Sequence, residues 1–533
     1  MAYKYGNNVT KTTQRQPIFG KEKEMVQNDA GGYVFKVSPV QRLKRFLILG
    51  SESGTFYVSN QRLGKENVQS MIDMIKNNGK EFVQTISEYT LNAPKNSPSI
   101  YALVLALTYG DSETKKLGYD LINKVCRTSS HMFEFIGYIQ EMKTQGLRGW
   151  SRGLRNGVSK FYDKPYDKLA YQICKYRQRE GMTHKDVLRL CHATSEDARV
   201  KNMFSWVVGK VEVPEDEYIL DFLTVLHTTS IKEATKLIEK RKFTWEMVNT
   251  ELLKNPDIWM SLLPHMPIHA MTRNLGRMAS IGMLKEFSDG TKEVVKKLTN
   301  VEEIKKSKVS PFQIVLAHSV YNNRHGFKGS LEWDTNSQIA EALSDAYVAS
   351  FTNVTKTGKN ILIGIDSSGS MCGSTIQGTV IDALYGAVAM SQITKKTEPN
   401  TQTVIFDTKY MADTYVTRGS GLAIQEAVNY YRKNLGGGTD CSLPIVYALE
   451  KQIPNIDTFI IYTDNETWAG GSHAYTEFKK YQRKYNNNAR IVNVAMTATR
   501  GSIIPENENN FLEVIGFDAS TPEIITKFIN GEF

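Results

Sequence analysis

Five oxygen-bearing side chains stand in three short segments of the last third of the chain. The segment IGIDSSGSM contains Asp366, Ser368 and Ser370, the segment GGGTDCS contains Thr439, and the segment YTDNET contains Asp464. Mg²⁺ is a hard ion that prefers about six oxygen ligands and keeps several waters. Two carboxylates and three hydroxyls would leave positions for water or for an oxygen of a partner. We therefore expect these residues to form a divalent-cation site.

The position of these residues after predicted strands is stronger evidence for a cation site than the Asp-x-Ser-x-Ser spacing, because ordinary turns also contain that spacing. Asp366 ends the apolar run ILIGID (361–366), and a continuous run of this kind is typical of a buried parallel strand. Asp464 ends the similar run TFIIYTD (458–464). Gly369 and the glycines at 436–438 permit the tight bends that such loops require. The segments are thus expected to meet at one edge of a sheet.

Residues 356–533 alternate between apolar runs and amphipathic patterns, which predicts a doubly wound, Rossmann-like α/β domain. Ligand sites in such domains lie beyond the carboxyl ends of the strands, where the five residues stand. Further strands are expected at 403–408, 490–497 and 511–517, and helices at 379–393, 423–433, 442–451, 475–485 and 521–529.

A catalytic site is not expected. A phosphatase that used Asp366 as its nucleophile would typically need a second Asp at the position of Ser368. The chain contains neither a G-x-x-x-x-G-K-[ST] phosphate loop nor an H-E-x-x-H zinc motif. His265 and His269 are four residues apart, but the neighbouring prolines argue against a shared helical face.

The composition favours a soluble, cytoplasmic protein, which we expect to be a monomer. The chain of 533 residues is long enough for two or more domains and contains no apolar run long enough to span a membrane. The first residues lack the apolar core of a signal peptide. The five cysteines are scattered without metal-binding spacing, which is typical of a reducing compartment.

The positive charge lies in the first two thirds of the chain. Residues 1–355 contain 50 Lys and Arg against 38 Asp and Glu, whereas residues 356–533 contain 16 against 18. An excess of positive charge attracts polyanions such as nucleic acid. On charge alone, a soluble surface that happens to be basic is an equally good explanation.

Residues 36–355 contain many short helical patterns and few strand signals, which favours stacked helical hairpins over a compact helical domain. No repeat of fixed length marks them, so both architectures stay open. Residues 1–35 are polar and are expected to form a loose arm. The polar stretch FTNVTKTGKN (351–360) is expected to connect the helical domain to the α/β domain.

One polar segment, ICKYRQREGMTHKDVLRLCHATS (173–195), combines cations at helical spacing. Lys175 and Arg179 are four residues apart and are expected on one helix face. After a break at Gly181, a second helix would carry further cations on one face, namely Lys185, Arg189 and His192. Such a cluster could bind phosphates, although a solvated charged face is the commoner outcome for such a run.

The chain resembles the Ro autoantigen family, the RNA-binding TROVE proteins, from about residue 40 to its end. The resemblance rests on a specific combination of motifs, among them FLILGSESGTFYV (46–58), LALTYGDSETKKLGYDLINKVCRTSSHMFEFI (105–136), GWSRGLRNGVSKFY (149–162), KYRQREGMTHKDVLRLCH (175–192), MPIHAMTRNLGRM (266–278), SPFQIVLA (310–317), GGTDCSLP (437–444) and FIIYTDNETWAGGSH (459–473).

This resemblance implies a ring of HEAT-like helical repeats closed by a von Willebrand factor A domain. It also implies a metal-ion-dependent adhesion site, which takes Mg²⁺ and matches the five residues of the cation site. Family members bind Y RNA on an outer surface, which Lys175, Arg179 and His192 match, and single-stranded 3′ ends of misfolded small RNAs in the central hole. Arg273 and Arg277 are candidates for that hole.

The resemblance therefore implies a non-catalytic RNA quality-control protein that can reach an exoribonuclease similar to polynucleotide phosphorylase through bound RNA. The alternative is a metal-dependent protein-binding scaffold on which the basic charge is incidental.

Overall fold

The computed structural model describes residues 13–50, 60–91, 96–143, 149–179, 181–212, 214–309, 311–326, 330–351, 356–376, 379–413, 421–506, 508–517 and 521–532. The chain divides into two compact units, each considered separately below. The sheet unit comprises residues 1–68 and 343–533, and the helical unit comprises residues 69–342. This division differs from the expected boundaries near residues 35 and 355, because the described residues among the first 68 pack with the α/β domain.

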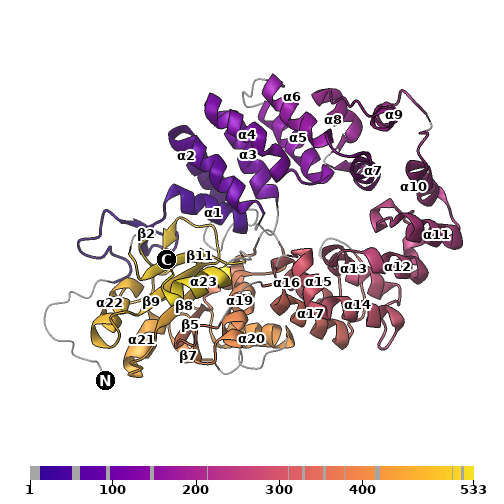
Figure 1. Ribbon diagram of the computed structural model, residues 1–533. Coiled ribbons are helices and arrows are strands. Elements are labelled where there is room, and N and C mark those ends of the chain that lie inside the picture. Colours follow the sequence, from indigo (N-terminus) through magenta and orange to yellow (C-terminus); the bar gives the residue numbers. More distant parts are fainter. Residues whose placement is uncertain are drawn as a thin grey trace. The chain divides into compact units, whose positions relative to one another are not determined.

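A six-stranded sheet forms the centre of the sheet unit (Figure 1), in the order β11-β9-β8-β5-β6-β7. All neighbouring strands are parallel except the edge pair β6 and β7. Every residue of β5 and β8 is buried, as their continuous apolar sequences predict. The strands are β5 (Ile361–Asp366), β6 (Thr401–Phe406), β7 (Tyr410–Ala412), β8 (Thr458–Thr463), β9 (Arg490–Ala495) and β11 (Phe511–Ile515).

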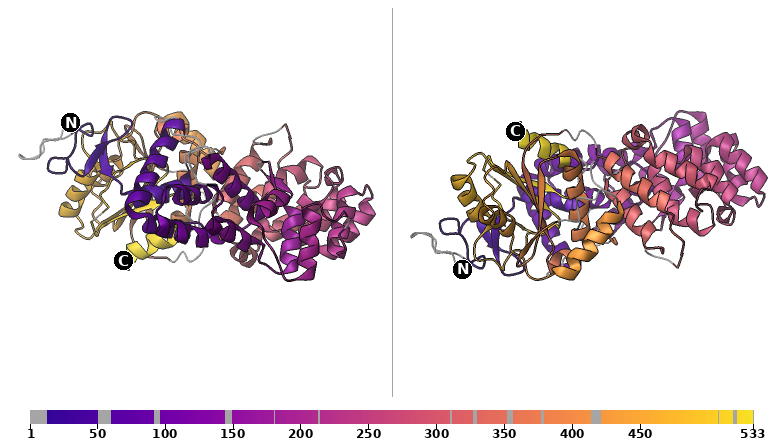
Figure 2. Two further views of the ribbon diagram at one scale, coloured as in Figure 1. Left: turned by 90° about the horizontal axis from the view of Figure 1, so that it is seen from above. Right: turned by 90° about the horizontal axis from the view of Figure 1, so that it is seen from below.

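Helices cover both faces of this sheet, as the two views of Figure 2 show. On one face, α21 (Leu443–Glu450) and α22 (Ala474–Lys484) bury Ile445 and Phe478 in a core with Leu362 and Phe459. Elsewhere α19 packs on β5 and α23 on β11, with α20 beside α19. These helices are α19 (Ala383–Thr397), α20 (Gly421–Asn434) and α23 (Thr521–Asn530), which confirms the expected doubly wound architecture.

The described part of the N-terminal segment is not a loose arm. β1 (Met25–Gln27) and β2 (Tyr33–Lys36) form an antiparallel sheet with β10 (Gly501–Ser502) of the α/β domain. The following helix, α1 (Pro39–Leu49), begins at the Ser38 cap, and its buried Arg45 contacts β11. For residues 13–35 the arm prediction was wrong, because strands of three or four residues are too short to produce a visible alternation, whereas residues 1–12 lie outside the described residues.

The helical unit is a succession of short helices in which neighbours along the chain pack together, as expected for stacked hairpins (Figure 1). α3 packs on α4 and α5, and α10 and α12 both pack on α11. The helices are α3 (Ser97–Tyr109), α4 (Ser112–Val125), α5 (Ser129–Lys143), α6 (Arg152–Ser159), α7 (Tyr166–Lys175), α8 (His184–Cys191), α9 (Ala198–Val207), α10 (Glu217–His227), α11 (Ile231–Arg241), α12 (Pro256–Leu262), α13 (Ile268–Ser280), α14 (Asp289–Thr299), α15 (Val301–Ser307) and α16 (Pro311–Asn322).

Two helices span the points along the chain at which the units divide. α2 (Asn60–Tyr89) is interrupted by non-helical backbone at Asn78, and α17 (Ser337–Ala349) precedes the α/β domain. Within the described ranges, no helix has the length and apolar character needed to cross a membrane.

Candidate cation site and basic cluster

The five residues of the predicted cation site stand on three loops, of which two follow β5 and β8 and the third connects α20 to α21. Asp366 ends β5, and Ser368 and Ser370 lie at the start of the short helix α18 (Gly369–Gly373). Thr439 precedes α21, and Asp464 follows β8 directly. All five are at most 1% exposed. The parallel order of the sheet therefore brings these loops together, as expected.

Hydrogen bonds hold the first loop in a defined conformation. Asp366 accepts from the Thr463 hydroxyl at 2.7 Å and from the Ser368 amide at 2.9 Å. The hydroxyl oxygens of Ser368 and Ser370 are 3.0 Å apart. The Gly369 amide donates to the Gly437 carbonyl at 3.1 Å, which joins the first loop to the second.

Two oxygens of the site have no hydrogen-bond partner among the described residues. They are Oδ2 of Asp464 and Oγ1 of Thr439, and both are shielded from solvent. Buried polar atoms almost always find a partner, because leaving them unpaired is unfavourable. These two orphaned oxygens therefore indicate that the loops are arranged to contact something further.

The electrostatics of the site are those of two carboxylates in a dry environment. Burial and the nearby Asp464 carboxylate raise the pKa of Asp366 to about 7. Burial likewise raises the pKa of Asp464, while the Ser370 hydroxyl opposes that shift. Two carboxylates in one dry site repel each other, so a positive charge between them would stabilise both. A hard divalent cation fits a set of two carboxylates and three hydroxyls.

No group of three or more His, Cys, Asp or Glu side chains in the described part of the chain is placed to hold a metal. A cation site here must accordingly use hydroxyl ligands.

The N-terminal segment braces these loops, which the sequence analysis did not foresee. Asn28 donates to the carbonyls of Asn465 and Thr467 at 3.2 and 2.8 Å. The Ala30 amide donates to the buried Glu466 carboxylate at 2.9 Å. Asp440, which neighbours Thr439, is bonded to Ser442 and to the N-terminal segment. No local pattern links residues so distant in sequence.

The predicted RNA-binding residues are arranged differently from the expectation. Lys175 and Arg179 do not share a helix face, because α7 ends at Lys175 and Arg179 lies in the short strand β3 (Gln178–Arg179). β3 forms a hairpin with β4 (Met182–Thr183) around Gly181, whose φ is +72°. The hairpin replaces the continuous helix that the i, i+4 spacing predicted.

Lys175 is largely buried, whereas Arg179 is about half exposed. Lys175 donates to the Tyr171 hydroxyl at 3.0 Å and lies 3.7 Å from the Glu246 carboxylate. Arg179 lies 3.8 Å from Glu134, whose side chain is 9% exposed. Each cation thus has one acidic partner, and Arg179 keeps a surface open to a ligand.

The second predicted helix exists as α8, and Thr183 caps it with Asp186 in a reciprocal capping box. Lys185 and Arg189 are exposed on α8, and His192 is exposed at its end with a φ of +55°. In the described ranges, no hydrogen bond or ion pair connects these three residues to Lys175 or Arg179.

Two partly buried histidines lie within electrostatic reach of Lys175, Arg179 and cations from distant segments. Burial lowers the pKa of His131 to about 4, and the positive charges of Arg127, Arg179 and Arg273 contribute. Burial and the charges of Arg273 and Lys175 also lower the pKa of His269. We call this group the basic cluster; it comprises Arg127, His131, Lys175, Arg179, His269 and Arg273. Of these, the sequence analysis singled out only Lys175, Arg179 and Arg273 as cations for RNA.

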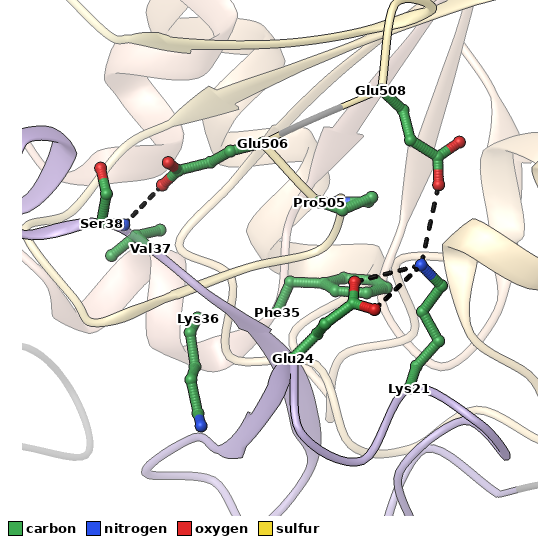
Figure 3. Close-up of a pocket in the computed structure, with 9 residues that line it drawn as sticks. All are labelled: Lys21, Glu24, Phe35, Lys36, Val37, Ser38, Pro505, Glu506 and Glu508. Carbon is green, nitrogen blue, oxygen red and sulfur yellow. Dashed lines mark hydrogen bonds and ion pairs between the residues drawn. The ribbon is translucent and has the colours of Figure 1, made fainter.

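A separate pocket of about 530 Å³ in the sheet unit is lined by charged residues (Figure 3). Its charges are satisfied internally. Lys21 lies 3.1 Å from Glu24 and 3.9 Å from Glu508, and Glu506 accepts from the Ser38 amide at 2.6 Å. Lys36 donates to the Lys23 carbonyl at 2.9 Å, so each of the five charged side chains in the lining already has a partner among the described residues.

Comparison with known proteins supports the relationship that the motifs suggested. Residues 26–218 and 234–326 match the TROVE domain, and residues 360–529 match the Ro60 vWA domain. The chain is 31% identical to the RNA-binding protein RO60 of Caenorhabditis elegans, over 95% of this chain and 90% of that protein. It is 30% identical to the RNA-binding protein RO60 of Deinococcus radiodurans, over 96% of each chain.

The fold also matches a solved structure. The crystal structure of the Deinococcus radiodurans RO (RSR) protein aligns with a TM-score of 0.68 and 27% identity, covering 93% of this chain and 100% of that chain. The TROVE match alone extends over more than half of the residues, and the two RO60 relatives align along almost the whole length. The chain therefore belongs to the TROVE (Ro60) family, with a helical-repeat region joined to a von Willebrand factor A domain.

Proposed function

We propose that this protein binds small non-coding RNA and has no catalytic activity of its own. In this proposal, Y RNA binds the exposed cations of α8, and single-stranded 3′ ends of misfolded small RNAs bind at the basic cluster, to which Lys175 and Arg179 are thereby moved from the expected Y RNA surface. The names of the two RO60 relatives support RNA as the ligand. The role would be RNA quality control in the cytoplasm, with an exoribonuclease reached through the bound RNA.

The basic cluster is the observation that carries this proposal. It gathers four Lys and Arg side chains and two histidines from several elements of the helical unit. Only two acidic partners, Glu134 and Glu246, form ion pairs with it among the described residues. An excess of like charge raises the energy of the unbound surface, and a phosphate chain would relieve it. Phosphate contacts of this kind supply most of the affinity for nucleic acid.

Salt-dependent binding tests the proposal. An RNA hairpin with a single-stranded 3′ tail is titrated with wild type and with the Arg179→Ala, Arg273→Ala double variant. Each lost phosphate contact should lower the slope of log K against log salt by about 0.7–0.9. Lys254→Ala is the matched control, because Lys254 is an exposed cation paired only with the neighbouring Glu251. An unchanged slope in the double variant contradicts the proposed site.

The two RNA surfaces can be separated in the same assay. The Lys185→Ala, Arg189→Ala double variant should weaken binding of a fully base-paired small RNA, and His192→Ala should act in the same direction. These variants should leave binding of a free single-stranded tail unchanged. If each double variant weakens the binding of both RNAs equally, the assignment of the two RNAs to different surfaces is wrong.

We further propose that Asp366, Ser368, Ser370, Thr439 and Asp464 hold Mg²⁺. The orphaned oxygens of Thr439 and Asp464 and the raised pKa of Asp366 support this proposal. A bound Mg²⁺ would keep a coordination position for a carboxylate of a protein partner. This second function, metal-dependent protein binding, uses the sheet unit and is compatible with RNA binding by the helical unit. It predicts that EDTA or Asp366→Ala abolishes protein capture without changing RNA affinity.

A further inference from the structure

A pocket of about 340 Å³ opens between α13 and α16 of the helical unit. The two helices pack against each other, and the segment that carries Leu331 and Trp333 borders the pocket. Its volume lies at the small end of the range of about 300–1,000 Å³ that is usual for ligand pockets. A ligand that fills it must be correspondingly small, or be one part of a larger molecule.

The walls of the pocket are mainly apolar and include a fixed aromatic ring. Trp333 packs directly on Gly276, where an added Cβ would come within 2.7 Å of the indole ring. The indole nitrogen donates to the Tyr321 carbonyl at 2.9 Å, which holds the ring in place. The aliphatic part of the wall consists of Leu275, Leu316, Ala317, Val320 and Leu331. Such walls suit a flat, apolar group.

Two arginines one helical turn apart line the pocket from α13. Arg273 is exposed and Arg277 is half-buried. In the described part of the chain neither forms an ion pair, and no carboxylate lines the pocket. Two unneutralised guanidinium groups beside an apolar pocket favour a ligand that combines a flat ring with an anion.

Arg273 also belongs to the basic cluster, so the pocket and the cluster share a residue. A polyanion lying on the cluster would therefore pass the pocket. This relationship favours a nucleotide within a chain over a free anionic amphiphile, since only the nucleotide uses both features. A base in a duplex is stacked and paired, and only an unpaired nucleotide can turn its base into a pocket.

We propose that this pocket receives one unpaired nucleobase of the bound RNA, with the adjoining phosphate held by Arg273 and Arg277. The inference rests on the proposed RNA binding and adds a defined subsite to it. The base would contact Trp333 and the aliphatic wall, while the two guanidinium groups would fix its backbone. The pocket would thus distinguish single-stranded from paired RNA by shape.

Filling the pocket without changing its charge tests this inference. Ala317 lies half-buried on α16 and lines the pocket, and Leu is a good helix former. Ala317→Leu should weaken binding of the tailed hairpin about ten-fold, as expected for one lost base contact, and leave the salt slope unchanged. Ala198→Leu is the matched control, because Ala198 is exposed at the first position of α9.

A series of tailed hairpins, each with one abasic nucleotide at a different tail position, identifies the base. Wild type should bind the hairpin that is abasic at one particular tail position about ten-fold more weakly than the intact hairpin. Ala317→Leu should bind these two hairpins with equal affinity. Arg277→Gln is a second variant that leaves the pocket volume free, and it should lower both affinity and salt slope. These two responses separate the role of the base from that of the phosphate.

The outcomes distinguish this inference from the function on which it rests. If the wild-type protein binds no RNA, the proposed function fails. If wild type binds RNA in a salt-dependent manner but Ala317→Leu binds equally well, only the base pocket is overturned. Saturable binding of dodecanoate that Ala317→Leu abolishes, with RNA affinity unchanged, would assign the pocket to an amphiphile and also overturn the inference.

Discussion

The side-chain amide of Gln14 donates a hydrogen bond of 2.7 Å to Asp440, 426 residues further along the chain. Gln14 is fully buried. Its carbonyl oxygen accepts from the Thr467 hydroxyl at 2.6 Å and from the Gly470 amide at 3.1 Å. A single side chain therefore connects the second and third loops of the candidate cation site. The N-terminal segment is thus a structural part of the α/β domain.

Gln14→Ala should lower the free energy of unfolding by about 2–3 kcal/mol, because it leaves buried polar groups of both loops without partners. The same change should weaken Mg²⁺ binding, since the loops that carry Thr439 and Asp464 lose their brace. Urea unfolding and isothermal titration with Mg²⁺ measure the two effects. Gln27→Ala is the matched control, because the exposed Gln27 side chain bonds, among the described residues, only to the Gly31 carbonyl. Equal stability of the two variants contradicts the bracing role.

The sheet and its loops could be predicted from sequence because their signals are local. Continuous apolar runs ending in Asp366 and near Asp464 mark buried parallel strands, and parallel strands place their carboxyl ends together. The positions of Asp366, Ser368, Ser370 and Asp464 follow from that geometry, whereas Thr439 stands in the loop between α20 and α21. The bracing by Gln14 and Asn28 could not be predicted, because it depends on contacts over more than 400 residues.

The arrangement of the basic residues, in contrast, could not be predicted from the sequence. The spacing of Lys175 and Arg179 suggested a helix face, but the chain leaves the helix at Tyr176 and turns at Gly181. The spacing of two charged residues contains no information on where a helix ends. The charges of Arg127, Arg179 and Arg273 all act on His131, although the three residues lie in separate segments of the helical unit. Only the tertiary structure reveals which cations share a surface.

Removal of one buried carboxylate should abolish the response to Mg²⁺. A ligand that binds only the folded state stabilises it by about 2.7 kcal/mol at one hundred times its dissociation constant. Wild type should therefore gain this stability on addition of Mg²⁺, and Asp366→Asn should gain none. In EDTA, Asp366→Asn should be at least as stable as wild type, because it removes the repulsion from Asp464.

Asp457→Asn provides the comparison for the cation experiment. Asp457 precedes β8 at the opposite edge of the sheet and accepts from the Asn360 amide at 2.9 Å. This variant loses a carboxylate from the same unit but should keep the full response to Mg²⁺. If Mg²⁺ stabilises Asp366→Asn as much as it stabilises wild type, Asp366 is not a ligand of the cation.

The ion pair between Arg45 and Glu513 should contribute far more than an exposed pair of the same length. Arg45 lies 2.6 Å from Glu513, and the two side chains are 0% and 3% exposed. Arg45 also donates to the carbonyls of Thr499 and Gly501. Arg45→Met should cost about 3–5 kcal/mol, because it leaves Glu513 buried without a counter-charge. Urea unfolding measures this loss.

The exposed pair Lys254–Glu251 is the internal standard for this experiment, since its atoms are also 2.6 Å apart but its side chains are 62% and 72% exposed. Lys254→Met should change the free energy of unfolding by about 0–1 kcal/mol. The Arg45→Met, Glu513→Gln double variant should lose less than the sum of the single variants. Similar losses of stability in Arg45→Met and Lys254→Met would show that burial does not determine how much each ion pair stabilises the protein.

Stability should decrease as the pH falls below 6.5, because of buried histidines in the helical unit. His184 is 4% exposed, bonds through Nδ1 to the Tyr162 hydroxyl at 2.9 Å and packs against Phe133. Burial lowers the pKa of His184 to about 4. Between pH 6.5 and 4 the unfolded chain binds a proton that the folded chain refuses, so acid favours unfolding. The contribution of His184 to the free energy of unfolding is complete above pH 6.5. Below pH 6.5 it decreases by about 1.4 kcal/mol per pH unit.

His184→Gln tests this assignment by removing the titrating group from the same position. Wild type and variant are compared first at pH 8, where His184 is neutral in both folded and unfolded chains, so any difference there reflects packing alone. From pH 7 to pH 5 wild type should lose about 2 kcal/mol more than the variant, since one histidine fewer takes up a proton on unfolding. His318, whose pKa burial also lowers to about 4, should behave in the same way. Parallel pH profiles for wild type and His184→Gln would show that His184 does not cause the acid sensitivity.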